Sequence, residues 1–211
     1  MPRSRLAVLL LAPLVVLPAA CGGGDDTGGL PTVSSTPTEA SSSTPATTPT
    51  PTLAPTTVPA SSSQKYGALT LVINHTPKPP ANADLALRAY DEFEQSSHKS
   101  LATNVEDPGV VRRSAGAALR DIRSVLQDQK TKKVRTGGLV TVTTKVVRVG
   151  AAVAALDTCY DQSKSVLIRA DGSTYVGPGT KKNPELKASV ILVNVGALWK
   201  VSEYNLKAGP C

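Results

Sequence analysis

The stretch Ala151–Asp161, which reads AAVAALDTCYD, decides the fold of this chain. Its first part is an apolar run of the kind that forms a buried strand. It ends in Cys159, Tyr160 and Asp161, and aspartate is a residue type that favours turns. The next cysteine, Cys211, is the last residue of the sequence. We expect a Cys159–Cys211 disulfide that closes a small domain around this strand.

Residues 1–20 have the layout of an export signal. Two arginines precede the apolar run Leu6–Leu17, and small residues lead to Cys21. The run is too short to span a bilayer, which takes about 20 apolar residues. The segment resembles the bacterial lipoprotein signal, whose cysteine is diacylated and becomes the mature N-terminus. It departs from that pattern at Pro18, where leucine is usual, and a secretory signal cut just before the cysteine is the alternative.

Residues 21–63 combine the lipidated cysteine with a tether. From Thr27 to Ser63 nearly every residue is Thr, Pro, Ser, Ala or Gly. Such a segment has too few large apolar side chains to offset the entropy of ordering, so we expect it to be disordered. Its role would be to space the domain from the membrane within the cell wall. An O-glycosylated stalk and an unmodified spacer both fit this composition.

The number of cysteines supports the same assignment. The chain has three, and an odd thiol in an exported protein needs an explanation. Acylation of Cys21 supplies one and leaves Cys159 and Cys211 to pair, as oxidation outside the cytosol favours. A metal site is the weaker alternative, because two cysteines without a nearby histidine cannot complete a tetrahedral ligand set. We expect neither a metal nor a cofactor.

The composition limits the classes of partner. Aromatic residues make up only 3% of the chain, so the core must be built from Val, Leu, Ile and Ala. The net charge of +7 favours acidic partners such as an anionic wall polymer, although a solvated basic surface that maintains solubility is the simpler explanation. Nucleic acid is not expected, because the protein is exported and its basic run at 112–135 lacks stacking aromatics.

Residues 64–211 are expected to form one globular domain that begins with helices. Before them, residues 66–74 alternate in the manner of a strand, which we expect to pair with an edge of the main sheet. A first helix from about 82 to 99 would bury Leu85, Ala89 and Phe93. The Asp-Pro pair at 107–108 then starts a second helix, which a glycine in its first half is expected to divide.

The second half of the domain has the pattern of strands. Val and Thr become frequent from Leu139, and Gly and Pro separate the apolar runs. Helices followed by an antiparallel meander predict an α+β domain with the helices on one face of a sheet. The expected strands span residues 139–149, 151–160, 165–169, 185–195 and 198–206.

Four features together resemble a known superfamily. They are VVRVGAAV at Val146–Val153, DTCYDQS at Asp157–Ser163, the Trp-Lys-Val of Trp199–Val201, and the terminal Cys211. The pattern resembles small exported actinobacterial proteins of the nuclear transport factor 2-like (SnoaL-like) superfamily, over roughly residues 85–211. The resemblance implies a cone-shaped curved antiparallel sheet wrapped on helices, an apolar pocket at its mouth, and bridged cysteines.

The resemblance also frames the candidate site. Aromatic residues that could line the implied pocket are Tyr90, Phe93, Trp199 and Tyr204, although most such side chains are simply part of a core. Some members of the superfamily are isomerases, cyclases or dehydratases, and many bind ligands or act as scaffolds without chemistry.

An acid–base enzyme on this fold needs a histidine or carboxylate in an apolar pocket. His98 and Asp161 are the candidates. His98 falls in the last turn of the first helix, where a cation interacts favourably with the helix dipole. Asp161 is placed to bind backbone amides in a turn. These structural roles outweigh catalysis, and His75, beside a proline-rich segment, is expected to be exposed.

We therefore expect a lipoprotein of the cell envelope, held on the extracytoplasmic side of the cell membrane by a diacylglyceryl anchor. Its domain would bind a small apolar ligand or an envelope protein without catalysis. The alternative is a SnoaL-like isomerase, cyclase or dehydratase that uses Asp161 or His98, and a purely structural domain with a filled pocket is a third. Whether either side chain points into an apolar pocket discriminates between them.

Overall fold

The computed structural model describes residues 57–75 and 79–211. The signal segment, Cys21 and most of the expected tether lie outside these residues. The helices are η1 (Ala81–Ala83), α1 (Asp84–Thr103), α2 (Pro108–Arg113), α3 (Gly116–Lys132) and α4 (Pro178–Lys182). The strands are β1 (Ser61–Tyr66), β2 (Leu69–His75), β3 (Val134–Val149), β4 (Val153–Arg169), β5 (Thr174–Tyr175), β6 (Glu185–Val195) and β7 (Leu198–Ala208).

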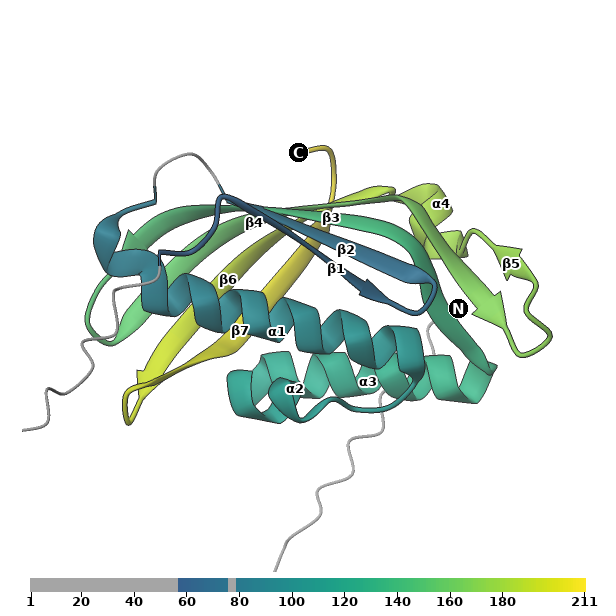
Figure 1. The fold of residues 1–211 in the computed structure, drawn as a ribbon, viewed down its shortest axis with the longest axis horizontal. Helices are drawn as coiled ribbons and strands as arrows, with labels where there is room; N and C mark the ends of the chain where they lie inside the picture. Colours follow the sequence, from purple (N-terminus) through teal and green to yellow (C-terminus); the bar gives the residue numbers. More distant parts are fainter. Residues whose placement is uncertain (1–56, 76–78) are drawn as a thin grey trace, which may run out of the picture. The chain divides into compact units, whose positions relative to one another are not determined.

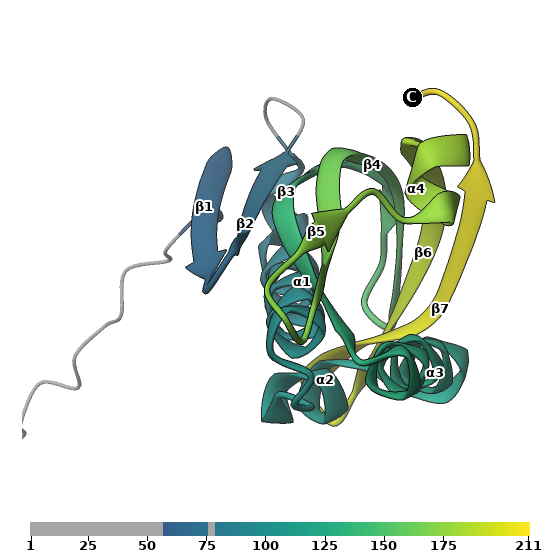
Figure 2. The same ribbon diagram turned by 90° about the vertical axis from the view of Figure 1, so that its right-hand side faces the viewer.

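The strands form one curved sheet, and helices α1, α2 and α3 lie on one of its faces (Figures 1 and 2). The strand order is β1-β2-β3-β4-β6-β7, with β5 paired to β4. The expected α+β class and the curved sheet are confirmed. All pairs are antiparallel except β2 and β3, which are parallel, so the expectation of a wholly antiparallel sheet was wrong for this pair.

The N-terminal segment is a hairpin and not the single strand expected over residues 66–74. Strand β1 begins at Ser61, within the range assigned to the tether, and turns at Gly67, whose φ of 60° favours glycine. Strand β2 alternates buried and partly buried residues and pairs with β3, which confirms the expected pairing with the sheet. His75 ends β2 and is buried, whereas we expected it to be exposed.

Helix α1 presents a different face to the core from the one expected. Ala89 and Phe93 are buried, but Leu85 is 66% exposed, because the buried stripe begins one residue later, at Ala86. The second predicted helix is divided as expected. The backbone is extended at the two residues before Gly116, which itself has a φ of 55°, and this break separates α2 from α3.

Two strands are longer than the sequence suggested. Strand β3 begins at Val134 and runs through Gly137-Gly138, which we expected to precede it. Strand β4 is one continuous strand where two were expected, over residues 151–160 and 165–169. Irregular pairing between β3 and β4, at Leu139/Thr141 and Val146/Arg148, interrupts the ladder, and bulges of this kind bend a strand.

The expected disulfide is present and lies on the outer face of the sheet. Cys159 and Cys211 are bonded, with their Cα atoms 5.7 Å apart. Side chains alternate along a strand, so Cys159 faces away from the helices while its neighbour Tyr160 faces them. The chain end is therefore fastened to the back of the sheet, and the backbone N–H of Cys211 also donates to Oε2 of Glu185.

The core lies between the inner face of the sheet and the helices. It is built mainly from Val, Leu, Ile and Ala, as the low aromatic content predicts. Of the larger side chains, Tyr90, Phe93, Tyr160 and Trp199 are buried within it. Over residues 57–75 and 79–211, no helix combines the length and the hydropathy needed to cross a membrane.

Candidate functional site

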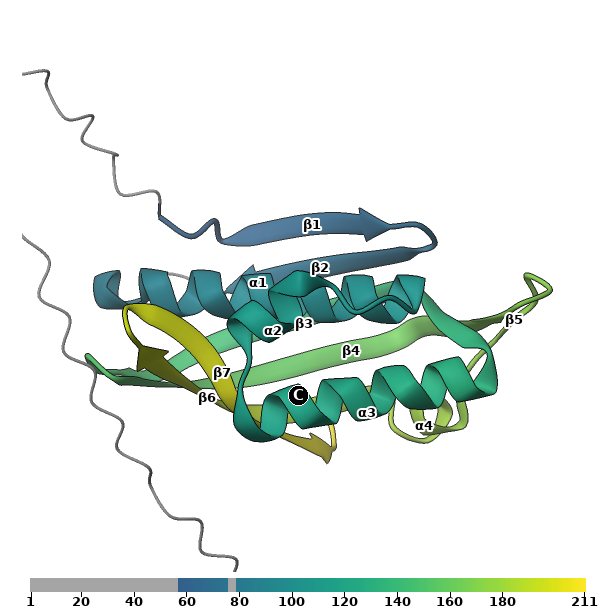
Figure 3. The ribbon, with the colours of Figure 1, turned by 90° about the horizontal axis from the view of Figure 1, so that it is seen from below.

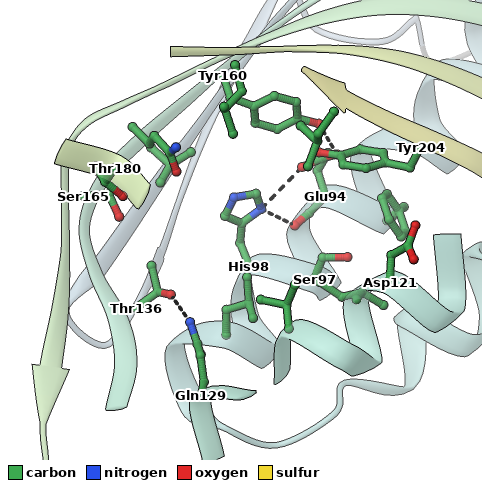
Figure 4. Close-up of a pocket in the computed structure, with 18 of the residues that line it drawn as sticks. Glu94, Ser97, His98, Asp121, Gln129, Thr136, Tyr160, Ser165, Thr180 and Tyr204 are labelled. Carbon is green, nitrogen blue, oxygen red and sulfur yellow. Dashed lines mark hydrogen bonds and ion pairs between the residues drawn. The ribbon is translucent and has the colours of Figure 1, made fainter. Parts of the chain in front are cut away.

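A cavity of about 310 Å³ lies between the inner face of the sheet and helices α1 and α3 (Figure 4). Helix α1 contributes Phe93, Glu94, Ser97, His98 and Leu101, and α3 contributes Ala118, Asp121, Ile122, Val125 and Gln129. The strands and α4 supply Thr136, Val140, Tyr160, Gln162, Ser165, Leu167, Thr180, Leu186, Tyr204 and Leu206. The walls are mainly apolar, with a polar group at Glu94 and His98.

The lining residues lie on one face of each helix and strand because their spacing in the sequence matches the helical and strand periodicities. The residues of α1 recur at three- and four-residue intervals, which puts them on one face of the helix, and those of α3 do the same. Figure 3 shows α1 and α3 running side by side beneath the sheet. In β4, Tyr160 and Gln162 are two residues apart and face the same side. The cavity is thus the space left between two helix faces and one sheet face.

Glu94 is a carboxylic acid in an apolar interior. It is 1% exposed, and Oε1 accepts a hydrogen bond of 2.7 Å from the hydroxyl of Tyr160. The Tyr160 hydroxyl in turn lies 2.5 Å from that of Tyr90. Burial raises the pKa of Glu94 to about 7, against the opposing effect of its tyrosine hydrogen bonds, and the charge of Asp91 adds to the rise. Glu94 therefore exchanges a proton near neutral pH.

His98 lies beside Glu94 and faces the cavity (Figure 4). Its Nδ1–H donates to the backbone oxygen of Glu94 at 2.9 Å, and Nδ1 is 3.4 Å from Oε2 of the same residue. Burial lowers the pKa of His98, which favours the neutral ring. With the proton on Nδ1, the lone pair is on Nε2, which has no hydrogen bond within the described part of the chain. His98 is therefore a hydrogen-bond acceptor at the wall.

Two of the four aromatic residues predicted to line a pocket do so. Phe93 and Tyr204 form part of the wall, and their rings meet edge to face with centroids 5.9 Å apart. Tyr90 is fully buried and does not line the cavity. It contacts the lining residue Tyr160 through a hydrogen bond between the two hydroxyl groups. Trp199 is a core residue outside the cavity lining, so its predicted role was wrong.

Of the two acid–base candidates, one lines the cavity and the other does not. His98 lines the cavity, and α1 continues for five residues beyond it, so its position is not the terminal one that we expected. Asp161 faces outward from β4, outside the cavity, and its Oδ1 accepts from the backbone N–H of Ser163 at 2.9 Å. Hydrogen bonds from Ser163 hold the pKa of Asp161 below its usual value. The amide-binding role expected for Asp161 is confirmed, and its position outside the cavity gives no support to the alternative, an acid or base.

Sequence reasoning missed Glu94 and Tyr160. A glutamate in the middle of a helix normally indicates a solvated surface. Tyr160 was not considered separately, because attention went to its neighbour Cys159. A signal was present, because Glu94 follows the buried Phe93 and precedes His98 by four residues, which places it on the buried face. No cluster of three or more His, Cys, Asp or Glu side chains suited to a metal ion occurs within residues 57–75 and 79–211.

Neither a protein-family model nor a curated protein sequence matches the chain. Solved structures resemble it at low identity. The intermembrane space region of the chloroplast protein ARC6 aligns with a TM-score of 0.43 at 12% identity, over 62% of this chain and 100% of that one. A protein described as an aromatic ring hydroxylase from Novosphingobium aromaticivorans aligns with a TM-score of 0.44 at 10% identity, over 62% and 92%. Aln2 from Streptomyces sp. aligns with a TM-score of 0.39 at 10% identity, over 63% and 94%.

Proposed function

We propose that this domain binds a small, largely apolar molecule in the cavity between the sheet and helices α1 and α3. The observation that carries the proposal is the cavity itself, about 310 Å³ in volume and lined mainly by apolar side chains. Ligand pockets of small molecules have this size and character, with a few polar groups that fix orientation. Glu94, His98 and Tyr160 are those polar groups here.

We also propose that this is one of the small exported actinobacterial proteins of the nuclear transport factor 2-like (SnoaL-like) superfamily. Helices that precede a curved sheet, a cavity between them and the Cys159–Cys211 bond all support this assignment. Acylated Cys21 would anchor the protein on the extracytoplasmic side of the cell membrane. The order of signal, cysteine and tether in the sequence supports that location. Envelope proteins and anionic wall polymers are further partners for the outer surface.

Binding can be tested with a neutral apolar probe. We would titrate naphthalenemethanol by calorimetry into the full chain carrying Cys21→Ala, which removes the proposed acylation site. Val125 lines the cavity but is 47% exposed, so Val125→Trp should block the mouth and weaken binding about tenfold. Val147→Trp is the matched control, because Val147 is 55% exposed and lies outside the cavity. No binding by the parent, or equal loss in both variants, would contradict the proposal.

A second candidate function rests on one observation, the orientation of His98. Its Nδ1 is held by Glu94, so the unprotonated Nε2 could remove a proton from a substrate carbon next to a carbonyl group. Such a step suits an isomerase, cyclase or dehydratase of the SnoaL-like kind. The test is deuterium exchange at the carbon next to the carbonyl of an apolar cyclic ketone, followed by NMR. Equal exchange rates for the parent and His98→Gln would remove the enzymatic candidate.

A further inference from the structure

The cavity has the opposite charge character from the protein as a whole. The chain carries a net charge of +7, yet no Lys or Arg is present among the described residues that line the cavity. The lining residues that bear a carboxylate are Glu94, deep in the wall, and Asp121, which is exposed at the rim on α3. A molecule inside the cavity therefore meets negative charge without a compensating cation.

The cavity offers two fixed hydrogen-bond acceptors in His98 and Gln129, beside hydroxyls such as that of Ser97, which can donate or accept. His98 accepts through Nε2, because its one proton is donated from Nδ1 to the backbone oxygen of Glu94. The Tyr160 hydroxyl already donates to Glu94 and is not free to donate to a ligand. Oε1 of Gln129 also lines this region and is buried without a partner within the described residues. The cavity is suited to a ligand that brings hydrogen-bond donors.

We propose that the ligand is a lipophilic amine, whose ammonium group donates to Nε2 of His98. The carboxylate of Glu94, on the Nδ1 side of the same ring, balances its charge through the low-dielectric interior. This inference rests on the proposed binding function and specifies its ligand class. The apolar body of the amine would lie against Phe93 and Tyr204. An anionic ligand such as a fatty acid is disfavoured, because its carboxylate would lie near Glu94 in a medium of low dielectric constant.

Proton exchange at Glu94 gives this proposal a pH signature. The groups that face Glu94 are Asp91, His98 and Tyr90 on its own helix, Tyr160 on β4 and Tyr204 on β7, with Asp121 across the cavity. The pKa of Glu94 is about 7 in the empty cavity, and an ammonium group would lower it. Amine binding then releases a proton below pH 7. Its affinity should rise with pH up to about 7 and level off above it, by at most about tenfold per unit.

Three probes with one naphthyl body and different head groups test the inference on the full chain with Cys21→Ala. They are naphthylmethylamine, naphthalenemethanol and naphthoate, titrated by calorimetry at pH 7.5 in two buffers of different ionisation enthalpy. We expect the amine to bind about tenfold more tightly than the alcohol and the carboxylate to bind least. We also expect the amine affinity to fall about fivefold between pH 7 and pH 6, with proton release.

A matched pair of variants tests whether Glu94 causes the preference for the amine over the alcohol. Glu94→Gln should remove the advantage of the amine over the alcohol. Glu92→Gln, two residues earlier on α1, should keep that advantage, because Glu92 pairs with Arg112 and Arg113 outside the cavity. The pH dependence of amine binding is measured on the parent protein alone. It therefore still tests the role of Glu94 if Glu94→Gln does not fold.

The outcomes separate the two proposals. If the alcohol binds and the amine has no advantage, or the carboxylate binds most tightly, the amine inference is overturned while the binding function stands. If the amine is favoured equally by the parent and Glu94→Gln, the assigned role of Glu94 is overturned. If no probe binds, the proposed binding function fails and the amine inference fails with it.

Discussion

Nε2 of His75 lies 3.1 Å from Oδ2 of Asp91, and this buried pair joins the end of β2 to helix α1. Both residues are 8% exposed. The remaining polar atoms of the two side chains, Nδ1 of His75 and Oδ1 of Asp91, have no partner within the described residues. Each side chain therefore depends on the other for its hydrogen bonding. The contact fastens the N-terminal hairpin, which otherwise packs through the apolar face of β2.

Loss of this pair should destabilise the domain and loosen the hairpin. His75→Ala would leave Asp91 buried without its partner, and removal of one member of a buried pair costs about 3 kcal/mol. Urea unfolding measures the loss, and hydrogen exchange should show faster exchange in β1 and β2. Glu92→Gln is the control, because Glu92 takes part in a surface ion pair of small value. Equal stability of the two variants would contradict a structural role for the pair.

The disulfide should contribute substantially to stability. Cys159 and Cys211 are 52 residues apart, and the chain-entropy model gives about 4 kcal/mol for closing a loop of that length. Cys159→Ser should lose that amount in chemical unfolding, and reductant should lower the melting temperature of the parent. The double variant Cys159→Ser/Cys211→Ser is the control, since reductant should not affect it. Identical melting temperatures of the parent with and without reductant would show that the bond does not contribute.

Gly138 should not tolerate a side chain. Its φ is 84°, and a Cβ at this position would clash with the backbone oxygen of Lys164 in β4. Gly172 has the same φ, but a Cβ there would meet nothing. Gly172→Ala therefore measures the backbone strain alone, about 1 kcal/mol. Gly138→Ala should cost more in chemical unfolding, and equal losses would mean that β3 and β4 separate easily.

Glu94 should make stability depend on pH. Its pKa is about 7 in the folded protein and near 4.5 when exposed, so the folded state holds the proton more tightly. The stabilisation is complete below pH 4.5 and is lost as the pH rises through 7. The parent should lose about 3 kcal/mol relative to Glu94→Gln over this interval. Chemical unfolding of both at several pH values measures the difference, and a constant difference would mean that Glu94 titrates normally.

We predict that the location of the protein depends on Cys21. Cys21→Ala should move the protein from the membrane fraction to the soluble fraction of the host envelope, because one apolar anchor is removed. Immunoblots of the two fractions, with the parent as reference, measure the change. If Cys21→Ala stays with the membrane, another feature holds the protein there.

Periodicity and turn chemistry predicted the class of fold, since both depend on local sequence. The divided second helix followed from one glycine, and the disulfide followed from the number of cysteines. Features that depend on how the elements pack against one another were harder to predict. Leu85 and Ala86 are adjacent in a helix, and only the docking angle of α1 decides which of them is buried. Likewise, local sequence does not predict the pairing of β2 with β3, because the paired residues Leu69 and Gly138 are separated in the chain by helices α1, α2 and α3.

The candidate site was predictable only in part for the same reason. Phe93 and Tyr204 were singled out because they are aromatic, whereas Glu94 was not singled out. Its burial depends on a hydroxyl from Tyr160, in a strand that follows 66 positions later. Asp161 faces the same side of β4 as Cys159, as strand alternation predicts, and therefore lies outside the cavity. A long-range partner decides the chemistry of Glu94, whereas Asp161 is held by its near neighbour Ser163.

The parallel pairing of β2 with β3 has a consequence for the order of folding. Strand β2 can find its partner only after the chain has looped back past α1, α2 and α3, and such long-range closure is slow and entropically costly. Local elements, including the β6–β7 hairpin, have no such delay. We therefore infer that the N-terminal hairpin docks late during folding.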